Sequence, residues 1–372
     1  MSYNVLIEEF CEVYNLGKVK TTELFSTGVA NRTYLVELTE KKGVKSDKYV
    51  IKALNPSSYR NEEAVHRLEV TEYVSELANK RGITSVLAKK INGKAINNLH
   101  GQNYIVFDFC DGKIIALNKI TSKNCFEIGQ MLANMHNINF EGLLKSEFNT
   151  DIKLYKTYGS KRKTRVSWNK YLKKFRESND SPTWISRFEE LIDDLYEMFD
   201  LTFASSNSFV PQDVLIAHSD LNNHNVLWKD ETPHFIDWER VCFIDTTYDC
   251  LFTAMRWATK NRAECEKNSL DKDRLYSFFE GYIEKRRINS ESIKDCLYII
   301  IFKKLLYLRS NMIKYLDTED ELEKKRVDGV IAFTLYIMKG YINLISDLEE
   351  IVSFINEYQW SKEFGDKSPN PI

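Results

Sequence analysis

The sequence predicts an α+β, bilobal fold, with a small β-rich amino-terminal lobe and a large, mainly helical carboxyl-terminal lobe. Strand-like runs cluster before residue 110, and apolar residues recur at helical spacing through most of the chain after it. Only 14 Gly and 6 Pro interrupt 372 residues, a composition that favours helices. A chain of this length favours two subdomains, which we place at residues 1–110 and 111–372.

The amino-terminal lobe is expected to contain a short helix, a β-hairpin, a longer helix and a further strand. Alternating apolar residues predict the strands, and apolar residues three or four apart predict the helices. Gly82 is expected to end the longer helix, and Asp111-Gly112 breaks the last strand. In chain order the expected elements span residues 6–13, 33–38, 49–53, 61–81 and 104–109.

The carboxyl-terminal lobe is expected to be helical, apart from two short strands around a polar turn. The strands are expected at residues 225–228 and 234–237. The expected helical regions span residues 126–137, 151–208 and 248–354.

The strongest functional signal lies in residues 218–237. Asp220 follows His218 by two residues and precedes Asn225 by five, which is the His-x-Asp-x-x-x-x-Asn spacing of the protein-kinase catalytic loop. Such an Asp accepts the proton of the attacking hydroxyl group, and such an Asn holds Mg²⁺ through its amide oxygen. Asp237 ends the next strand, where a short hairpin would return its carboxylate to the loop as a second magnesium ligand. A polar turn without chemistry is the alternative, but the strand, turn and Asp that follow favour transfer of a nucleotide's terminal phosphate to a hydroxyl group.

Lys52 is the candidate phosphate-binding lysine. It lies in the β-rich run Tyr-Val-Ile-Lys upstream of a long helix, the context in which such a lysine is found. A helix glutamate is expected to pair with it. We choose Glu69, which lies mid-helix beside apolar residues, with Glu72 one turn later as the close rival. A solvent-facing lysine on an edge strand is the alternative.

Residues 26–31 form a candidate phosphate-covering turn. The segment contains Gly28 and ends at Asn31, and a Ser/Thr/Gly turn can offer backbone N–H groups to phosphate. An ordinary hairpin turn is the alternative.

The overall charge indicates no nucleic-acid or membrane partner. The net charge is −2, from 52 basic and 54 acidic residues. The seven cysteines contain no CxxC pair, which indicates reduced thiols. The first ten residues lack the basic region of a signal peptide, and no run approaches the ~18 apolar residues of a membrane span. We therefore expect a cytoplasmic protein.

Taken together, these segments resemble the aminoglycoside phosphotransferase and choline kinase superfamily, which has a bilobal, protein-kinase-like fold. The resemblance covers most of residues 20–260, and Asp237-Trp238-Glu239 is similar to this superfamily rather than to eukaryotic protein kinases. The matching segments are Gly28-x-x-Asn31-x-x-Tyr34, Val50-Ile51-Lys52, His218-x-Asp220-x-x-x-x-Asn225-Val226-Leu227 and Phe235-Ile236-Asp237-Trp238-Glu239.

The resemblance implies a role for each reacting group. Asp220 would be the catalytic base, and Asn225 and Asp237 would hold Mg²⁺. Lys52, tethered by Glu69, would bind the α- and β-phosphates of ATP or GTP.

It also implies roles for residues around them. Gly28 and Asn31 would belong to the phosphate loop, and the backbone of Asp108 and Cys110 would meet the adenine. His218 and Asp249 would brace the catalytic loop, whereas His136 would be structural.

Two residues depart from the superfamily's pattern. Thr27 replaces a glycine that many members carry, which could loosen phosphate contacts, and Ser219 replaces the frequent glycine before Asp220. Neither departure removes a charged catalytic group, so the intact set argues against an inactive relative.

These motifs do not identify the acceptor. The resemblance implies a small-molecule hydroxyl acceptor bound by residues of about 141–215 and 260–355, and it allows aminoglycosides, choline, ethanolamine, homoserine or sugars. Acidic runs such as 317–321 would suit a cationic amino sugar, although such runs usually form a solvated helix face. Tryptophans such as Trp168 and Trp257 would suit a quaternary amine, although large aromatics are more often core residues. Three hypotheses follow: an aminoglycoside phosphotransferase-like enzyme, a kinase for choline, a sugar or another metabolite, and a nucleotide-binding regulatory protein without turnover.

Overall fold

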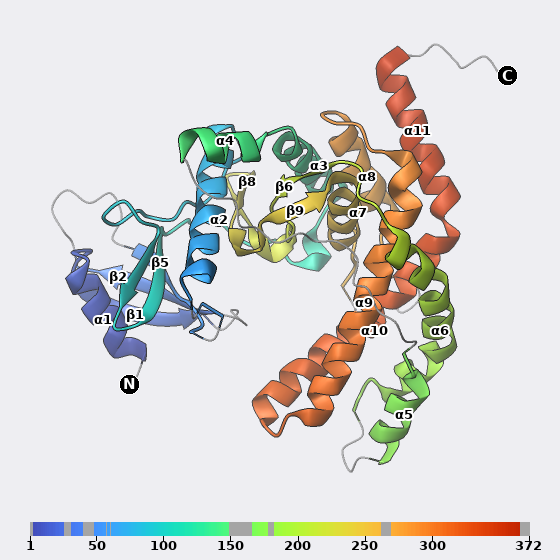
Figure 1. Ribbon diagram of the computed structural model, residues 1–372, viewed down its shortest axis with the longest axis horizontal. Coiled ribbons are helices and arrows are strands. Elements are labelled where there is room, and N and C mark those ends of the chain that lie inside the picture. Colours follow the sequence, from blue (N-terminus) through green and yellow to red (C-terminus); the bar gives the residue numbers. More distant parts are fainter. Residues whose placement is uncertain are drawn as a thin grey trace. The chain divides into compact units, whose positions relative to one another are not determined.

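The computed structural model describes residues 3–25, 31–39, 48–56, 58–59, 61–148, 166–177, 182–261 and 269–364. The chain divides into two compact units (Figure 1). The first contains Met1–Ile115, Ile138–Tyr155 and His218–Cys242, and the second contains Ala116–Asn137, Lys156–Ala217 and Phe243–Ile372. The first unit therefore extends beyond the expected amino-terminal lobe and includes the catalytic motif.

A five-stranded antiparallel sheet forms the centre of the first unit, with strand order β1-β2-β3-β5-β4. The strands are β1 (Val19–Phe25), β2 (Arg32–Leu38), β3 (Lys48–Ala53), β4 (Ile96–Leu99) and β5 (Gln102–Asp108). β2, β3 and β5 confirm the three expected strands. β1 and β4 were not predicted, because one is mostly polar and the other is a four-residue strand with two asparagines at its centre.

Two helices, α1 (Tyr3–Val13) and α2 (Glu62–Lys80), cover opposite faces of this sheet. Alternate residues of β5 show this: Tyr104 packs in the cluster with α1, and Ile105 packs in the cluster with α2. On β3, Ile51 lies in the α1 cluster. The side chain of Lys52, the next residue, therefore points to the face that α2 covers.

A β-hairpin made of β7 (Val226–Lys229) and β8 (Thr232–Phe235) carries the catalytic motif. Its two turn residues, Asp230 and Glu231, have φ of 48° and 62°, as a type I′ turn requires. The segment after β5 lies against this hairpin: a Cβ added to Gly112 would lie 2.9 Å from Leu227 Cβ. Helix α4 (Phe140–Glu147) packs on α2 within the same unit.

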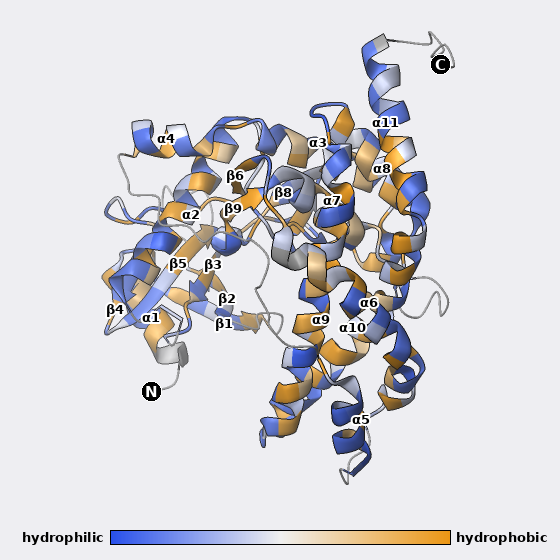
Figure 2. Cartoon of the chain, turned by 45° about the vertical axis from the view of Figure 1, so that its right-hand side comes forward, coloured by the Kyte–Doolittle hydropathy of each residue, from blue (hydrophilic) through white to orange (hydrophobic). Residues whose placement is uncertain are grey.

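The second unit is mainly helical. Its helices are α3 (Ser122–His136), α5 (Trp168–Glu177), α6 (Ile185–Ser208), α7 (Thr246–Trp257), α8 (Lys272–Ile283), α9 (Ile293–Asp317), α10 (Glu321–Ser346) and α11 (Leu348–Phe364). Two short strands, β6 (Val214–Ala217) and β9 (Cys242–Asp245), pair beside them. Apolar residues line α9 and α10 (Figure 2), and α9 packs against α6, α7 and α10.

Helix α10 is the one described helix that is long and apolar enough to cross a membrane by length and composition. Its most apolar 18-residue window has a mean hydropathy of 1.3, and 56% of that window is buried within the protein. From the sequence we expected no run near the ~18 apolar residues of a membrane span, and this window reaches that length. Its packing against α9 and α6 is that of a helix in a protein core.

Candidate active site

The catalytic loop is tied to the strand that leads to Asp237. His218 is fully buried, and its Nε2 lies 3.0 Å from the Ile236 carbonyl oxygen. Its Nδ1 accepts a hydrogen bond from the Asp220 backbone N–H at 3.4 Å. Because one ring nitrogen accepts, the other must donate, so this geometry selects the neutral Nε2–H tautomer. The ring thereby fixes the start of the loop.

Ser219 occupies a backbone conformation that normally favours glycine. Its φ is 59°, in the left-handed region, where a residue with a side chain costs about 1–2 kcal/mol. The Ser219 hydroxyl donates to the Arg240 carbonyl oxygen at 2.5 Å, which offsets part of that cost. The departure from glycine is therefore accommodated by a hydrogen bond that glycine could not form.

Asp220 and Asn225 lie in direct contact. The Asn225 amide nitrogen donates to the Asp220 carbonyl oxygen at 2.7 Å and to its carboxylate Oδ2 at 3.3 Å. Arg240 Nε lies 4.0 Å from the same carboxylate oxygen. These contacts fix which way the Asn225 amide faces, and they leave its Oδ1 directed away from Asp220.

Asp237 is brought to this loop by the hairpin. The Ile236 N–H donates to the Asn225 carbonyl oxygen at 3.0 Å, so the residues before β7 and after β8 lie side by side. Asp237 itself has φ of 64°, a left-handed conformation that begins the 3₁₀ turn Trp238–Arg240. Left-handed non-glycine residues cluster at functional sites, because the surrounding structure must hold them there.

The oxygen atoms of Asn225 and Asp237 fit a hard divalent cation such as Mg²⁺. Neither Asn225 Oδ1 nor Asp237 Oδ2 accepts a hydrogen bond from any residue that the structure describes. An amide oxygen and a carboxylate oxygen are ligands that Mg²⁺ prefers, with water completing the shell. The donor set therefore matches the metal that the motif implied.

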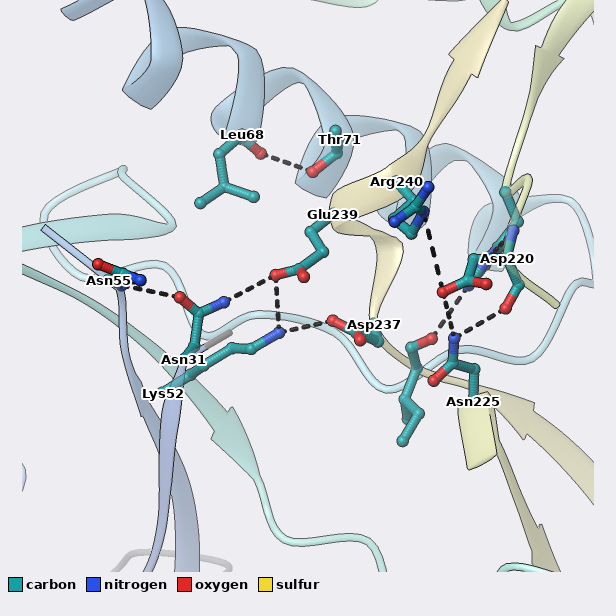
Figure 3. A network of polar contacts seen from close by, with 12 residues as sticks. Asn31, Lys52, Asn55, Leu68, Thr71, Asp220, Asn225, Asp237, Glu239 and Arg240 are labelled. Atoms are coloured by element: carbon teal, nitrogen blue, oxygen red, sulfur yellow. Dashed lines mark hydrogen bonds and ion pairs between the residues drawn. The ribbon is translucent and has the colours of Figure 1, made fainter. Parts of the chain in front are cut away.

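Lys52 lies between two carboxylates (Figure 3). Its Nζ is 2.5 Å from Asp237 Oδ1 and 3.0 Å from Glu239 Oε2. Burial by itself lowers the pKa of Lys52, but the charges and hydrogen bonds of Asp237 and Glu239 outweigh it and raise that pKa above its usual value. The ammonium group is thus charged and held beside the candidate metal ligands.

The expected pairing of Lys52 with Glu69 is corrected by the structure. The two carboxylate oxygens of Glu69 accept the backbone N–H groups of Ala95 and Ile96 at 2.9 and 3.1 Å. Glu69 thereby anchors α2 to the start of β4. Its carboxylate is occupied there, and Lys52 pairs with Asp237 and Glu239 instead.

The rival, Glu72, lies on α2 and is 7% exposed. Burial raises its pKa to about 8; the charge of Lys52 opposes this shift, and nearby Glu69, Asp237 and Glu239 add to it. At neutral pH the carboxyl group is therefore largely protonated, and it is not an ionic partner for Lys52.

The other expected site residues are distributed as follows. Asn31 is buried, and its amide nitrogen donates to Glu239 Oε2 at 2.9 Å. Gly28 lies outside the described residues. Asp108 ends β5 with an exposed side chain 3.8 Å from Lys89, and burial raises the pKa of the Cys110 thiol. Adenine contact by either remains a prediction.

Asp249 lies in the second unit, on α7. Its Oδ2 is 3.1 Å from His136 Nε2, and His136 Nδ1 is 2.7 Å from the Tyr282 hydroxyl. All three side chains are buried. This network joins α7, α3 and α8, and the bracing of the catalytic loop by Asp249 stays a prediction.

Glu239 is the site residue that sequence reasoning missed. It was part of the matching segment, but it was given no role. The available signal was its position two residues after Asp237, in the same turn. The side-chain contacts with Lys52 and Asn31, residues about 190 to 210 positions earlier, could not be inferred from spacing.

Comparison with known proteins identifies the class. A model of the phosphotransferase enzyme family matches residues 21–282, which is more than half of the chain. The protein therefore belongs to this family.

Solved structures share its fold. A spectinomycin phosphotransferase, in complex with ADP and spectinomycin, is 15% identical with a TM-score of 0.65, over 93% of this chain and 98% of that one. An amicoumacin kinase, in complex with AMP-PNP and Ca²⁺, is 14% identical with a TM-score of 0.56, over 91% of this chain and 95% of that one. A choline kinase from Cryptosporidium parvum is 11% identical with a TM-score of 0.52, over 96% of this chain and 99% of that one. These likenesses confirm the kinase-like fold, and at such identities they leave the acceptor undetermined.

Proposed function

We propose that the protein transfers the γ-phosphate of ATP or GTP to a hydroxyl group of a small molecule, in the presence of Mg²⁺. The observation that carries the proposal is that the Asp220–Asn225 contact and the Lys52–Asp237 ion pair occur within one compact unit. A base, two oxygen ligands and a phosphate-binding cation are the groups that phosphoryl transfer requires.

Each of these residues has a separate role in the proposed reaction. Asp220 orients the acceptor hydroxyl and accepts its proton as the oxygen–phosphorus bond forms. The bond from the γ-phosphorus to the β-phosphate oxygen breaks, and the nucleoside diphosphate leaves. Lys52 neutralises the α- and β-phosphates. Asn225 and Asp237 would hold Mg²⁺, which would supply further positive charge at the phosphate oxygens.

Nucleotide binding changes the surroundings of Lys52. Asp237 would hold the metal through Oδ2, and the positive charge of the metal would weaken the 2.5 Å contact of Oδ1 with Lys52. Lys52 is then available to the phosphates, and its raised pKa keeps it charged in both situations. Asp108 and Cys110, at the end of β5, are the proposed adenine-contacting segment.

Two of the structural relatives support a small, polar acceptor. They are a spectinomycin phosphotransferase and an amicoumacin kinase, and the choline kinase extends the range to amino alcohols. We propose an acceptor of the aminoglycoside or related antibiotic class, with choline, a sugar or another metabolite as the alternative. The free cysteines of the described residues agree with the proposed cytoplasmic location.

An acceptor panel tests the proposal. The purified protein is incubated with γ-labelled ATP or GTP and with aminoglycosides, spectinomycin, amino alcohols or sugars, and labelled product is separated from nucleotide. Transfer to one class identifies the acceptor. A wild type that binds nucleotide but transfers phosphate to every acceptor no faster than Asp220→Asn would contradict catalysis. That result would favour a regulatory role.

A further inference from the structure

Glu239 joins two strands to the turn that follows Asp237. Its Oε2 accepts hydrogen bonds from Lys52 Nζ at 3.0 Å and from Asn31 Nδ2 at 2.9 Å (Figure 3). Asn31 directly precedes β2, and its Oδ1 accepts the Asn55 backbone N–H at 2.8 Å. A single carboxylate therefore holds the lysine of β3 and the residue that leads into β2.

We propose that Glu239 is the positioning residue for Lys52: it keeps Lys52 and Asn31 in place while Asp237 holds Mg²⁺. This inference rests on the proposed function, because it assumes that Asp237 binds the metal of a bound nucleotide. Glu239 acts on the nucleotide through Lys52, and it is not itself a ligand of the metal.

Lys52 needs a carboxylate that remains with it. A buried ammonium group without a partner is unfavourable, and removing one partner of a buried ion pair leaves an uncompensated charge. Asp237 would be a weaker partner for Lys52 with a divalent cation on its other oxygen. Of the acidic residues on α2 beside the lysine, Glu69 is bonded to the backbone of β4, and the buried Glu72 is largely neutral at pH 7.

Glu239 is well placed to be that permanent partner. Its side chain is 19% exposed, and it lies in the 3₁₀ turn Trp238–Arg240. Trp238, the preceding residue, is buried with its ring 4.8 Å from the His218 ring. The Arg240 carbonyl oxygen, on the other side, accepts the Ser219 hydroxyl. Both neighbours are anchored, so the Glu239 carboxylate is held without further reorganisation.

Direct measurement of nucleotide affinity tests this role without an acceptor. Calorimetry with Mg²⁺ and AMP-PNP is carried out on the full chain, on Glu239→Ala, on Lys52→Ala and on the double variant. Glu239→Ala removes a charged hydrogen-bond partner of Lys52. Its affinity for AMP-PNP is therefore expected to be at least about tenfold lower than that of wild type. In the Lys52→Ala background the same change is expected to alter the affinity by less than about twofold, because Glu239 then has no lysine to position.

The magnesium dependence separates this role from metal binding. The Mg²⁺ concentration that half-saturates AMP-PNP binding is expected to stay unchanged in Glu239→Ala and to rise in Asp237→Asn. A further loss of affinity of about tenfold in the Lys52→Ala background, or a raised Mg²⁺ requirement in Glu239→Ala, would show that Glu239 contacts metal or nucleotide directly and would overturn the proposal. Unchanged affinity in Glu239→Ala alone would overturn it as well.

Two further variants guard against misfolding. Glu239→Gln keeps the shape and an accepting oxygen but loses the charge, so an affinity between those of wild type and Glu239→Ala is expected. Glu37→Ala breaks a more exposed ion pair of the same sheet, the 2.8 Å contact of Glu37 with Lys20, and is expected to leave AMP-PNP affinity unchanged. If the wild type binds no nucleotide, the proposed function fails and this role fails with it. If the wild type binds and only the Glu239 results disagree, the role fails alone.

Discussion

At the residue scale, Glu72 is a buried acid whose pKa links stability to pH. Burial raises that pKa to about 8, well above the 4.5 of an exposed glutamate. Between these two values the folded protein holds a proton that the unfolded chain has lost, so the free energy of unfolding falls as pH rises. Below about pH 4.5 both states are protonated, and the contribution of Glu72 to folding is fully present.

Glu72→Gln is therefore expected to remove this part of the pH dependence. The stability of the wild type relative to Glu72→Gln should decline from pH 5 to pH 8, by on the order of 1 kcal/mol per pH unit. Chemical denaturation of both proteins across that range measures the difference. Parallel stability profiles, with a constant gap between the two proteins, would contradict a raised pKa at Glu72.

Asp237 is expected to control the magnesium requirement. Asp237→Asn keeps an oxygen ligand but removes the negative charge that faces both the cation site and Lys52. The Mg²⁺ concentration for half-maximal nucleotide binding should rise at least about tenfold, which corresponds to about 1.4 kcal/mol. Asp230→Asn, in the turn of the same hairpin, is the matched control, since asparagine tolerates its positive φ. Equal Mg²⁺ requirements in the two variants would exclude Asp237 as a ligand.

The site residues differ in how far the sequence could predict them. Asp220, Asn225 and Asp237 could be placed together, because a two-residue hairpin turn leaves little freedom in where β8 returns. The partner of Lys52 could not be predicted in the same way. Glu69 and Glu72 are less than one helical turn apart, and only the rotation of α2 decides which one meets the β4 backbone. Glu239 reaches Lys52 across 187 positions, which no local pattern records.

At the element scale, α3 and α8 cross with their backbones in direct contact. A Cβ added to Gly281 of α8 would overlap the Phe126 carbonyl group, and one added to Gly129 of α3 would overlap the Phe278 carbonyl oxygen. Both glycines are required by this close approach. The crossing holds His136 of α3 within reach of Tyr282 of α8.

Gly281→Ala is expected to destabilise the second unit despite alanine's higher helix propensity. Overpacking typically costs about 1–3 kcal/mol, against a propensity gain of about 1 kcal/mol. Gly329→Ala, at an exposed position of α10 with open space around it, is the matched control and should be neutral or stabilising. Thermal unfolding compares the two variants. A Gly281→Ala protein as stable as Gly329→Ala would contradict the close crossing.

Elements with a strong apolar period were predictable, and the others were not. Helix α2 was expected at residues 61–81 and is found at Glu62–Lys80, because its apolar residues repeat and Gly82 ends it with φ of 87°. β1 and β4 have no such pattern, because edge strands depend on hydrogen bonds to a neighbour more than on apolar side chains. The expected helix at 151–208 is described only from residue 166 onward, as α5 and α6.

At the scale of the whole molecule, the chain places its candidate chemistry and most of its helices in different units. Lys52, Asp220, Asn225, Asp237 and Glu239 all belong to the first unit, whose segments come from three separate stretches of the sequence. The second unit contains α3 and α5 to α11, and we propose that residues of about 141–215 and 260–355 bind the acceptor. If the acceptor is bound by residues other than those that transfer the phosphate, the acceptor can vary within a family while the transfer chemistry stays the same.

Asp220 is tested by comparing wild type with Asp220→Asn in γ-phosphate transfer to the best acceptor of the panel. Asparagine preserves the shape of Asp220 but cannot take the proton. We predict that kcat falls by about 10²–10⁴-fold while the affinity for Mg²⁺–AMP-PNP stays within about twofold of wild type. Equal transfer rates in the two proteins would contradict the assignment of Asp220 as the catalytic base, and with it the account of the site.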